Sequence, residues 1–284
     1  MATTALTKKP TVVWHSQIDD DDPMHKPGSY EKKILAEGDS WFSLNAIPGT
    51  NLLEALRFKK EPIIVNCATP GDTLRNMITM RNDPSFQMEI EGGIVWDLIL
   101  LSGGGNDVID DAKWIIPASD VPQKVKAKPD QYCDIVPFNN TLDLIIDGYR
   151  KLFSIRDGTR SKCKGKPIVI HTYDKATPRN SPALFATAVK VNGPWLYPAL
   201  VRAQVPESQW NAVSDFILGA LAERLLELDD PANEIHVVDT RNTLTRAARD
   251  TFRSSNDWQN EIHPNSEGYA KLAAKISPVL AGWI

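Results

Sequence analysis

The sequence contains few cysteines, and none of them are paired at short spacing. Its 284 residues include only Cys67, Cys133 and Cys163. An odd, scattered set without a CxxC pair predicts neither a disulfide framework nor a zinc site. No group of His, Cys and Asp residues has the spacing of metal ligands either. We therefore expect no metal and no cofactor.

Long apolar runs and a strong excess of one charge are also absent. No stretch approaches 18 uninterrupted apolar residues, so we expect no transmembrane segment. The first 29 residues contain no apolar run typical of a signal peptide. We expect a cytoplasmic protein, and export by a route that needs no cleavable signal stays open. The net charge of -4 gives no reason to expect a nucleic acid as partner. The oligomeric state is left open.

Five short runs rich in Ile, Val and Leu stand out against this background. They are nearly continuous rather than alternating, which is typical of strands buried on both faces of a parallel sheet. Segments with helical spacing lie between them, the longest at 207–229. This alternation predicts a parallel sheet covered by helices on both faces, an α/β fold. The five runs are 32–38, 62–68, 97–103, 167–173 and 234–240.

We divide the chain into a polar N-terminal extension, residues 1–30, and a single domain, residues 31–284. Two stretches of the domain, about 108–137 and 174–203, are rich in proline and fit neither element type. Both follow strand ends, so both are expected over the same edge of the sheet. We favour a lid in the second, since Trp195, Leu196 and Tyr197 would be costly to expose. Ordinary surface excursions are the alternative.

Residues capable of chemistry follow several of the predicted strands. Ser40 comes directly after the first strand, in "GDSWFS". Gly71 follows the second in "NCATPGDT", and Asn106 follows the third in "GGGND". His263 lies beyond the fifth, in "NEIHPNSEGY". Because parallel strands end at one edge of the sheet, we expect these four residues to meet there.

The set is suited to acyl transfer. The Ser40 hydroxyl needs a base to take its proton, and His263 is the natural candidate. The backbone N–H groups of Ser40 and Gly71 and the Asn106 amide would supply an oxyanion hole. Taken singly, each residue has a structural alternative. Gly-Asp-Ser is a common turn, and "NCATPGDT" also fits a helix entry.

The four segments, in this order, resemble those of the SGNH or GDSL hydrolase family. "GDSWFS" looks like its first block, with Ser40 as nucleophile. Gly71 and Asn106 stand at the second and third blocks, and His263 at the fifth. The resemblance implies a three-layer α/β/α sandwich with a flavodoxin-like, five-stranded parallel sheet. It also implies a metal-free serine hydrolase that acts on esters.

One position departs from the family pattern, which usually has Asp three residues before its His. This sequence has Asn260 there. A carboxylate on the ring would hold the tautomer and stabilise the imidazolium, whereas an amide offers no charge. Asp257, which we rank first, or Glu261 would then reach the ring, with Asp239 as a further candidate. Alternatively, Asn260 orients His263 as a dyad, or the enzyme is slow or specialised.

Two further side chains are predicted to contact substrate. Trp41 adjoins the nucleophile, and His171 follows the fourth strand. Core packing and local hydrogen bonding are their respective alternatives.

We therefore predict an esterase or lipase that acts on a small-molecule ester, an acylated lipid or an acetylated sugar. A carbohydrate O-deacetylase, an acyltransferase, and a catalytically weakened binding protein on the same fold are the alternatives.

Overall fold

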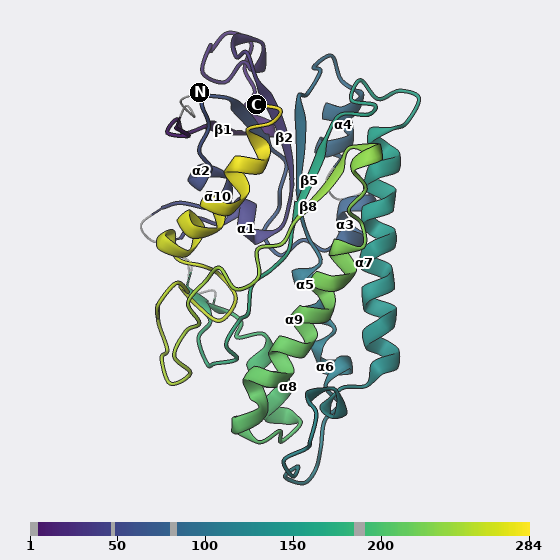
Figure 1. The fold of residues 1–284 in the computed structure, drawn as a ribbon, viewed down its shortest axis with the longest axis vertical. Helices are drawn as coiled ribbons and strands as arrows, with labels where there is room; N and C mark the ends of the chain where they lie inside the picture. The colour runs from purple at the N-terminus through teal and green to yellow at the C-terminus, as the bar shows by residue number, and fades with distance from the viewer. Residues whose placement is uncertain (1–4, 47–48, 80–83, 185–190) are drawn as a thin grey trace.

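Six parallel strands form one sheet through the centre of the protein (Figure 1). The structure is a computed structural model that describes residues 5–46, 49–79, 84–184 and 191–284. The strands lie in the order β1-β3-β2-β4-β5-β8. Their bounds are Thr11–Trp14 for β1, Lys33–Gly38 for β2, Ile63–Asn66 for β3, Leu98–Ser102 for β4, Ile168–His171 for β5 and Ile235–Val238 for β8. The α/β fold with a parallel sheet is thereby confirmed.

The edge strand β1 is the one strand of this sheet that the sequence did not predict. It pairs with β3, with Thr11 opposite Ile63, so part of the expected N-terminal extension belongs to the sheet. Four residues are too few to show a pattern, and only Val13 among them is buried. Without β1 the order is that of the flavodoxin-like sheet, as predicted.

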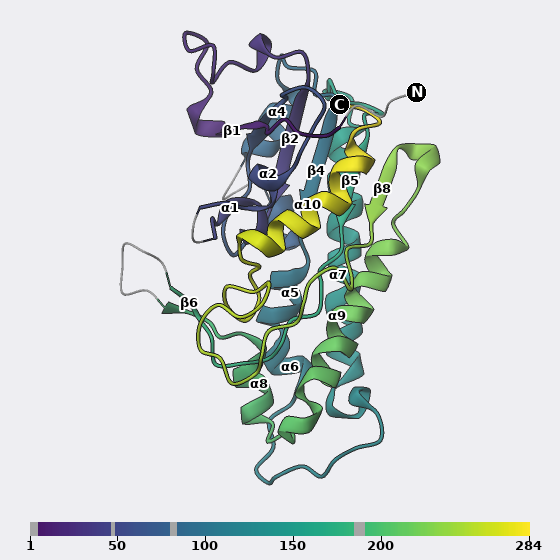
Figure 2. The same ribbon diagram turned by 60° about the vertical axis from the view of Figure 1, so that its left-hand side comes forward.

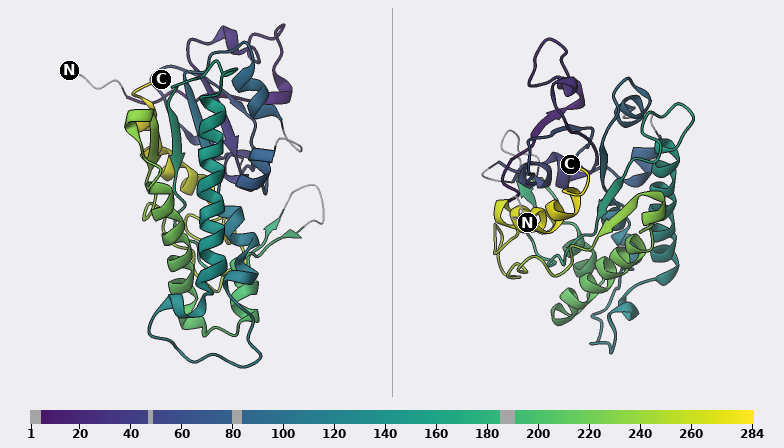
Figure 3. Two further views of the ribbon diagram at one scale, coloured as in Figure 1. Left: turned by 90° about the vertical axis from the view of Figure 1, so that its right-hand side faces the viewer. Right: turned by 45° about the horizontal axis from the view of Figure 1, so that its top comes forward.

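Helices cover both faces of the sheet. Figures 1 and 3 show α2 and α10 on one face, and α3, α7 and α9 on the other. The bounds are Ser40–Ser43 for α1, Leu52–Ala55 for α2, Leu74–Thr79 for α3, Ser85–Glu91 for α4, Gly105–Asp110 for α5, Ala112–Ile115 for α6, Ile135–Arg156 for α7, Leu196–Arg202 for α8, Trp210–Leu226 for α9 and Ser266–Leu280 for α10. Within the described ranges, no helix is both long enough and apolar enough to cross a membrane.

Side-chain caps fix where the helices beside the site begin. The Asp39 carboxylate accepts a hydrogen bond from Trp41 N–H at 3.0 Å and starts α1. The Asn265 side chain accepts one from Gly268 N–H at 2.9 Å and starts α10. Such caps pair backbone donors that have no partner inside the helix. Ser40 therefore stands at the first position of α1, directly after strand β2.

The second predicted insertion, 174–203, contains the short hairpin strands β6 (Ala183–Leu184) and β7 (Val191–Asn192) and helix α8. Residues 185–190 of this segment lie outside the described residues. Figure 2 shows the segment running beside the loop that follows β8. Several hydrogen bonds join them, among them those from Thr177 Oγ1 to Ala247 O at 3.0 Å and from Ser181 Oγ to Phe252 O at 2.7 Å. The segment therefore packs against the loop that carries His263.

The first predicted insertion, 108–137, is partly helical. Helix α5 ends inside it at Asp110, α6 lies within it, and α7 begins at Ile135. Apart from a short 3₁₀ helix, Pro129–Tyr132, the rest runs as a loop at the end of the molecule near α8 (Figure 1).

Strands β2 and β4 end side by side at the edge of the sheet that faces the site. Gly38 pairs with Ser102, and Asp39 N–H donates to Ser102 O at 3.1 Å. A Cβ on Gly38 would come within 2.7 Å of that carbonyl oxygen and 3.1 Å of the Phe42 ring. The two strands can approach this closely only because Gly38 has no side chain.

We expect Gly38→Ala to lower the free energy of unfolding by about 1–3 kcal/mol, because the added methyl overpacks this contact. Urea unfolding measures the change. Gly219→Ala in α9 is the matched control. A Cβ there meets nothing within 4 Å, so stability should rise by up to about 1 kcal/mol. Equal midpoints for the Gly38 variant and the parent chain would contradict the close approach.

Candidate active site

The hydroxyl of Ser40 lies against the imidazole of His263. Ser40 Oγ and His263 Nε2 are 2.8 Å apart, although 223 positions separate the two residues in the chain. Ser40 is 4% exposed and His263 7% exposed. The fold thus places a hydroxyl and a ring nitrogen at hydrogen-bonding distance in a site almost closed to solvent.

The other ring nitrogen of His263 is held by Asn260. Asn260 Oδ1 lies 3.0 Å from His263 Nδ1, and it also accepts from the backbone N–H groups of Ile262 at 3.1 Å and His263 at 2.9 Å. Backbone N–H groups only donate, so the Asn260 atom they face is its oxygen. Nδ1 must then carry the ring proton. Nε2 is left with its lone pair directed at Ser40, which is the form a general base requires.

Asp257, ranked first as the partner of His263, is placed elsewhere. Its carboxylate forms an ion pair with Lys271, at 2.6 and 2.7 Å, and accepts from Thr245 N–H at 2.5 Å. The Nδ1 atom of His263 faces Asn260 instead. The closeness of Asp257 to His263 in the sequence did not reveal that Lys271, on the second turn of α10, would form an ion pair with its carboxylate.

The two other acidic candidates are also engaged away from the ring. Glu261 accepts from the backbone N–H groups of Trp195, Leu196 and Tyr197, the last at 2.8 Å, and so caps the start of α8. Asp239 binds the Arg241 guanidinium at 2.8 Å. Of the explanations left open by the sequence, the structure fits a His263 ring oriented by an amide.

Burial sets the electrostatics of His263. It lowers the pKa of the ring to about 4, because the charged form loses solvation. The ring is therefore neutral at pH 7 and ready to accept a proton, but it is a weaker base than an ordinary histidine.

Asn106 and the start of α1 bring hydrogen-bond donors to the same place. Asn106 Nδ2 donates to Asp72 O at 2.8 Å, which uses one of its two hydrogens. Ser40 N–H is the first in α1 and has no acceptor within the helix. Gly71, one residue before Asp72, has φ +81° and occupies a turn closed from Asp72 N–H to Thr69 O at 3.2 Å. It lines a groove beside Thr73 and Asp107 rather than the pocket that holds Ser40 and Asn106.

A pocket with a cavity volume of about 30 Å³ opens onto Ser40 and Asn106. Its remaining polar lining is Asp39, Gly105 and Asp174. The Asp174 carboxylate is already held by four backbone N–H groups, at 2.7–2.9 Å. The other walls are mostly apolar and come from α1, α5, the segment that follows β5, α8, α9 and the His263 loop: Trp41, Ile109, Tyr173, Ala176, Leu196, Leu218, Trp258 and Ile262.

The two predicted substrate contacts have different positions. Trp41 lines the pocket, and its Nε1–H donates to Ile262 O at 3.2 Å. His171 does not line it. Its ring is 3% exposed, stacks on Trp41 with centroids 5.5 Å apart, and contacts Ser102 Oγ at 3.0 Å. The expectation that His171 contacts substrate is therefore wrong, because the ring turns inward beneath the site.

The structure adds aromatic residues that we did not propose as site members, Trp258 of the pocket wall among them. Tyr173 lines the pocket and donates to Asp39 Oδ2 at 2.5 Å. The Trp195 ring packs edge-on to His263, with centroids 5.4 Å apart. The aromatic character of 174–203 pointed to Trp195 in general terms, whereas no sequence signal marked Tyr173.

Residues 42–276 match the protein family described as "GDSL-like Lipase/Acylhydrolase". The chain belongs to this family. Its fold is accordingly the GDSL or SGNH hydrolase fold, and its activity class is that of an esterase or lipase-type enzyme.

Solved structures of a lipase and of an esterase are similar to this chain over most of its length. An extracellular lipase from Streptomyces rimosus is 14% identical with a TM-score of 0.47, covering 89% of this chain and 100% of its own. An acetyl-xylooligosaccharide esterase (a Trp-to-Ile mutant) from Geobacillus is 17% identical with a TM-score of 0.40, covering 87% and 93%. No curated protein sequence matches the chain.

Asn260→Asp should raise the pKa of His263 from about 4 toward its usual value, because a carboxylate on Nδ1 stabilises the imidazolium. All three donors that face Asn260 Oδ1 would still find an acceptor. A pH titration of the His263 ring by NMR measures the shift. Asp257→Asn is the matched control, which should leave this pKa nearly unchanged. A larger shift in the control would restore Asp257 as the partner.

Proposed function

We propose that the protein is a serine hydrolase that cleaves carboxylic esters through an acyl-enzyme on Ser40. The contact between Ser40 Oγ and His263 Nε2 carries the proposal, together with the pocket that Ser40 and Asn106 both line. Family membership supports it, because the description names lipases and acylhydrolases.

Ser40 Oγ attacks the ester carbonyl carbon while His263 Nε2 takes the hydroxyl proton. The tetrahedral oxyanion is stabilised by Ser40 N–H and the Asn106 amide, whereas Gly71, which lines a different groove, takes no part in this scheme. His263 then gives the proton to the departing alcohol oxygen, and the carbon–oxygen bond breaks. Water, activated by the same ring, attacks the acyl-enzyme and releases the carboxylic acid from Ser40.

Asn260 acts in this scheme as a positioning residue. Its carbonyl keeps the proton on Nδ1 and so keeps Nε2 free for Ser40. It supplies no charge to the imidazolium that forms during attack, so we expect a slower reaction than a carboxylate would allow.

An apolar acyl group fits the pocket better than a sugar does. Leu196, Leu218 and Ile262 offer no hydrogen-bonding groups to hydroxyls, and they favour a hydrocarbon chain. A carbohydrate O-deacetylase with its sugar bound outside this pocket is the second candidate.

Asn260 also motivates a third candidate, a binding protein with weakened chemistry. Covalent labelling of Ser40 by a fluorophosphonate probe separates the two classes, since a pure binding protein stays unlabelled.

Ser40→Ala should lower the hydrolysis of p-nitrophenyl esters by roughly 10⁴-fold or more, because the nucleophile is lost. Asn106→Ala should cost about 10²- to 10³-fold in kcat through the loss of one oxyanion donor. Steady-state kinetics measure both, and Ser154→Ala, an exposed serine of α7, is the control. Hydrolysis by Ser40→Ala at the parent rate would overturn the proposal.

Lengthening the acyl chain should raise kcat/KM by about fourfold per CH₂ until the pocket is filled, since burying one CH₂ gains about 0.8 kcal/mol. Leu218→Phe should move the optimum to shorter chains. A series of p-nitrophenyl esters measures the profile, with Val279→Phe on the exposed face of α10 as control. A preference for acetylated sugars over every longer ester would favour the second candidate.

A further inference from the structure

Beneath Ser40 lies a second set of hydrogen-bonded side chains, which the mechanism above does not use. It consists of Asp39, Ser102, His171 and Tyr173, named here the Asp39 cluster. The first three are at most 3% exposed and Tyr173 is 6% exposed. They come from the ends of β2, β4 and β5, so the cluster ties three strands together directly behind the nucleophile.

Four contacts of 3.0 Å or less involve the cluster, and a longer one of 3.3 Å joins the hydroxyls of Ser102 and Tyr173, each of which has a nearer partner. His171 Nδ1 lies 2.9 Å from Thr172 O, and His171 Nε2 lies 3.0 Å from Ser102 Oγ. Ser102 Oγ lies 3.0 Å from Asp39 Oδ1, and Tyr173 Oη lies 2.5 Å from Asp39 Oδ2. All four distances are those of hydrogen bonds, and each such bond needs a proton between its two atoms.

An ionised Asp39 and a neutral His171 leave one of these contacts without a proton. The imidazole, the Ser102 hydroxyl and the Tyr173 hydroxyl bring one proton each, which makes three for four contacts. With the ring proton on Nδ1, Ser102 can donate to His171 or to Asp39, but not to both. With the ring proton on Nε2, Nδ1 faces the Thr172 carbonyl and neither atom has a proton to offer.

One additional proton satisfies all four contacts. When the proton is on Asp39, the carboxyl donates a hydrogen bond to Ser102 Oγ, and the Ser102 hydroxyl donates one to His171 Nε2. When the proton is on His171, the same two hydrogen bonds run in the opposite direction. Burial raises the pKa of Asp39 to about 6 and lowers the pKa of His171 to about 4, which places the proton on Asp39.

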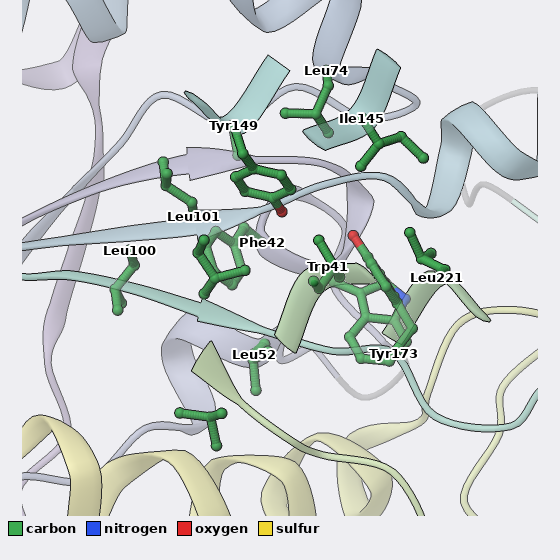
Figure 4. Close-up of a cluster of buried hydrophobic side chains, with 14 of the residues drawn as sticks. Trp41, Phe42, Leu52, Leu74, Leu100, Leu101, Ile145, Tyr149, Tyr173 and Leu221 are labelled. Atoms are coloured by element: carbon green, nitrogen blue, oxygen red, sulfur yellow. The ribbon is translucent and has the colours of Figure 1, made fainter. Parts of the chain in front are cut away.

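Among the residues that the structure describes, no positively charged side chain acts on the Asp39 carboxyl. The other ionisable side chains that interact electrostatically with it are Tyr149 of α7, Tyr269 of α10 and Asp107 of α5. Figure 4 shows Tyr149 and Tyr173 in this interior, together with Trp41. A buried carboxylate without a counter-ion is costly, and protonation removes that cost.

Asp39 also holds the turn that presents Ser40. Its side chain caps α1 through Trp41 N–H at 3.0 Å, its carbonyl accepts from Ser43 Oγ at 2.8 Å, and its N–H donates to Ser102 O at 3.1 Å. A shift of Asp39 therefore moves the residue that follows it, Ser40. A small displacement of a nucleophile from its base lowers the reaction rate strongly.

We propose that the Asp39 cluster binds one proton beyond those of its neutral hydroxyls and imidazole, and that His171 is thereby a positioning residue for Ser40. The inference rests on the proposed esterase function. As the pH rises, the extra proton leaves. One of the contacts is then left without a proton, so that two hydrogen-bond acceptors face each other. The turn then loosens and hydrolysis falls.

His171→Gln tests this, because a glutamine amide donates to Ser102 Oγ without needing the extra proton. His236→Gln on β8, whose ring contacts Glu234 and Trp283, is the matched control. The kcat/KM of the parent chain and of His236→Gln should fall by up to about tenfold over one pH unit above pH 6. The His171 variant should lose this decline.

A second readout does not depend on catalysis. The ring nitrogen signals of His171, assigned by their absence from His171→Gln, should change in NMR spectra over the same pH range. Signals that do not change between pH 5 and 8, or an alkaline decline that persists in His171→Gln, would overturn the inference. Absence of both hydrolysis and fluorophosphonate labelling would count against the esterase function alone, since the His171 signals would still report the proton.

Discussion

The hydrogen bond between His263 Nδ1 and Asn260 Oδ1 is the interaction on which the candidate site depends. Three donors converge on that one oxygen, so neither the amide nor the ring can turn without leaving a buried polar group unpaired. The ring proton is thereby fixed on the side away from Ser40. The amide oxygen thereby positions the ring. What it cannot supply is negative charge, and burial further lowers the basicity of the ring.

A carboxylate does lie close to the nucleophile, but on the other side of it. Asp39 stands between strand β2 and Ser40 and faces Ser102 and Tyr173, while His263 reaches Ser40 from the loop before α10. The site therefore separates two tasks that a serine–histidine–aspartate triad combines in one network. Orientation of the base is left to a neutral amide. The acidic group is used within the sheet edge, where its protonation bears on how the turn is held.

The sequence predicted much of the fold and of the candidate site, because the reactive side chains come directly after the carboxyl ends of predicted strands. Ser40 and Asn106 could be assigned to one edge, since parallel strands that read as continuous apolar runs end together. Strand β1 was missed because its four residues, of which only Val13 is buried, carry no such pattern. Asp257 and His171 were misplaced for a different reason. The sequence gives the loop or strand on which a side chain sits, whereas the direction it takes depends on partners such as Lys271 and Ser102, which only the fold brings near.

Closure of the site has opposing effects on the proposed reaction. Removing water weakens His263 as a base, because the imidazolium loses solvation. The same removal strengthens the fixed donors around the oxyanion, since Ser40 N–H and the Asn106 amide act in a medium of low dielectric constant and do not reorganise during the reaction. An apolar acyl chain drawn into the pocket would exclude the remaining water. The walls formed by Leu196 and Leu218 would then contribute to the chemical step as well as to binding, because the charge that develops on the ester oxygen is stabilised most where the pocket is driest.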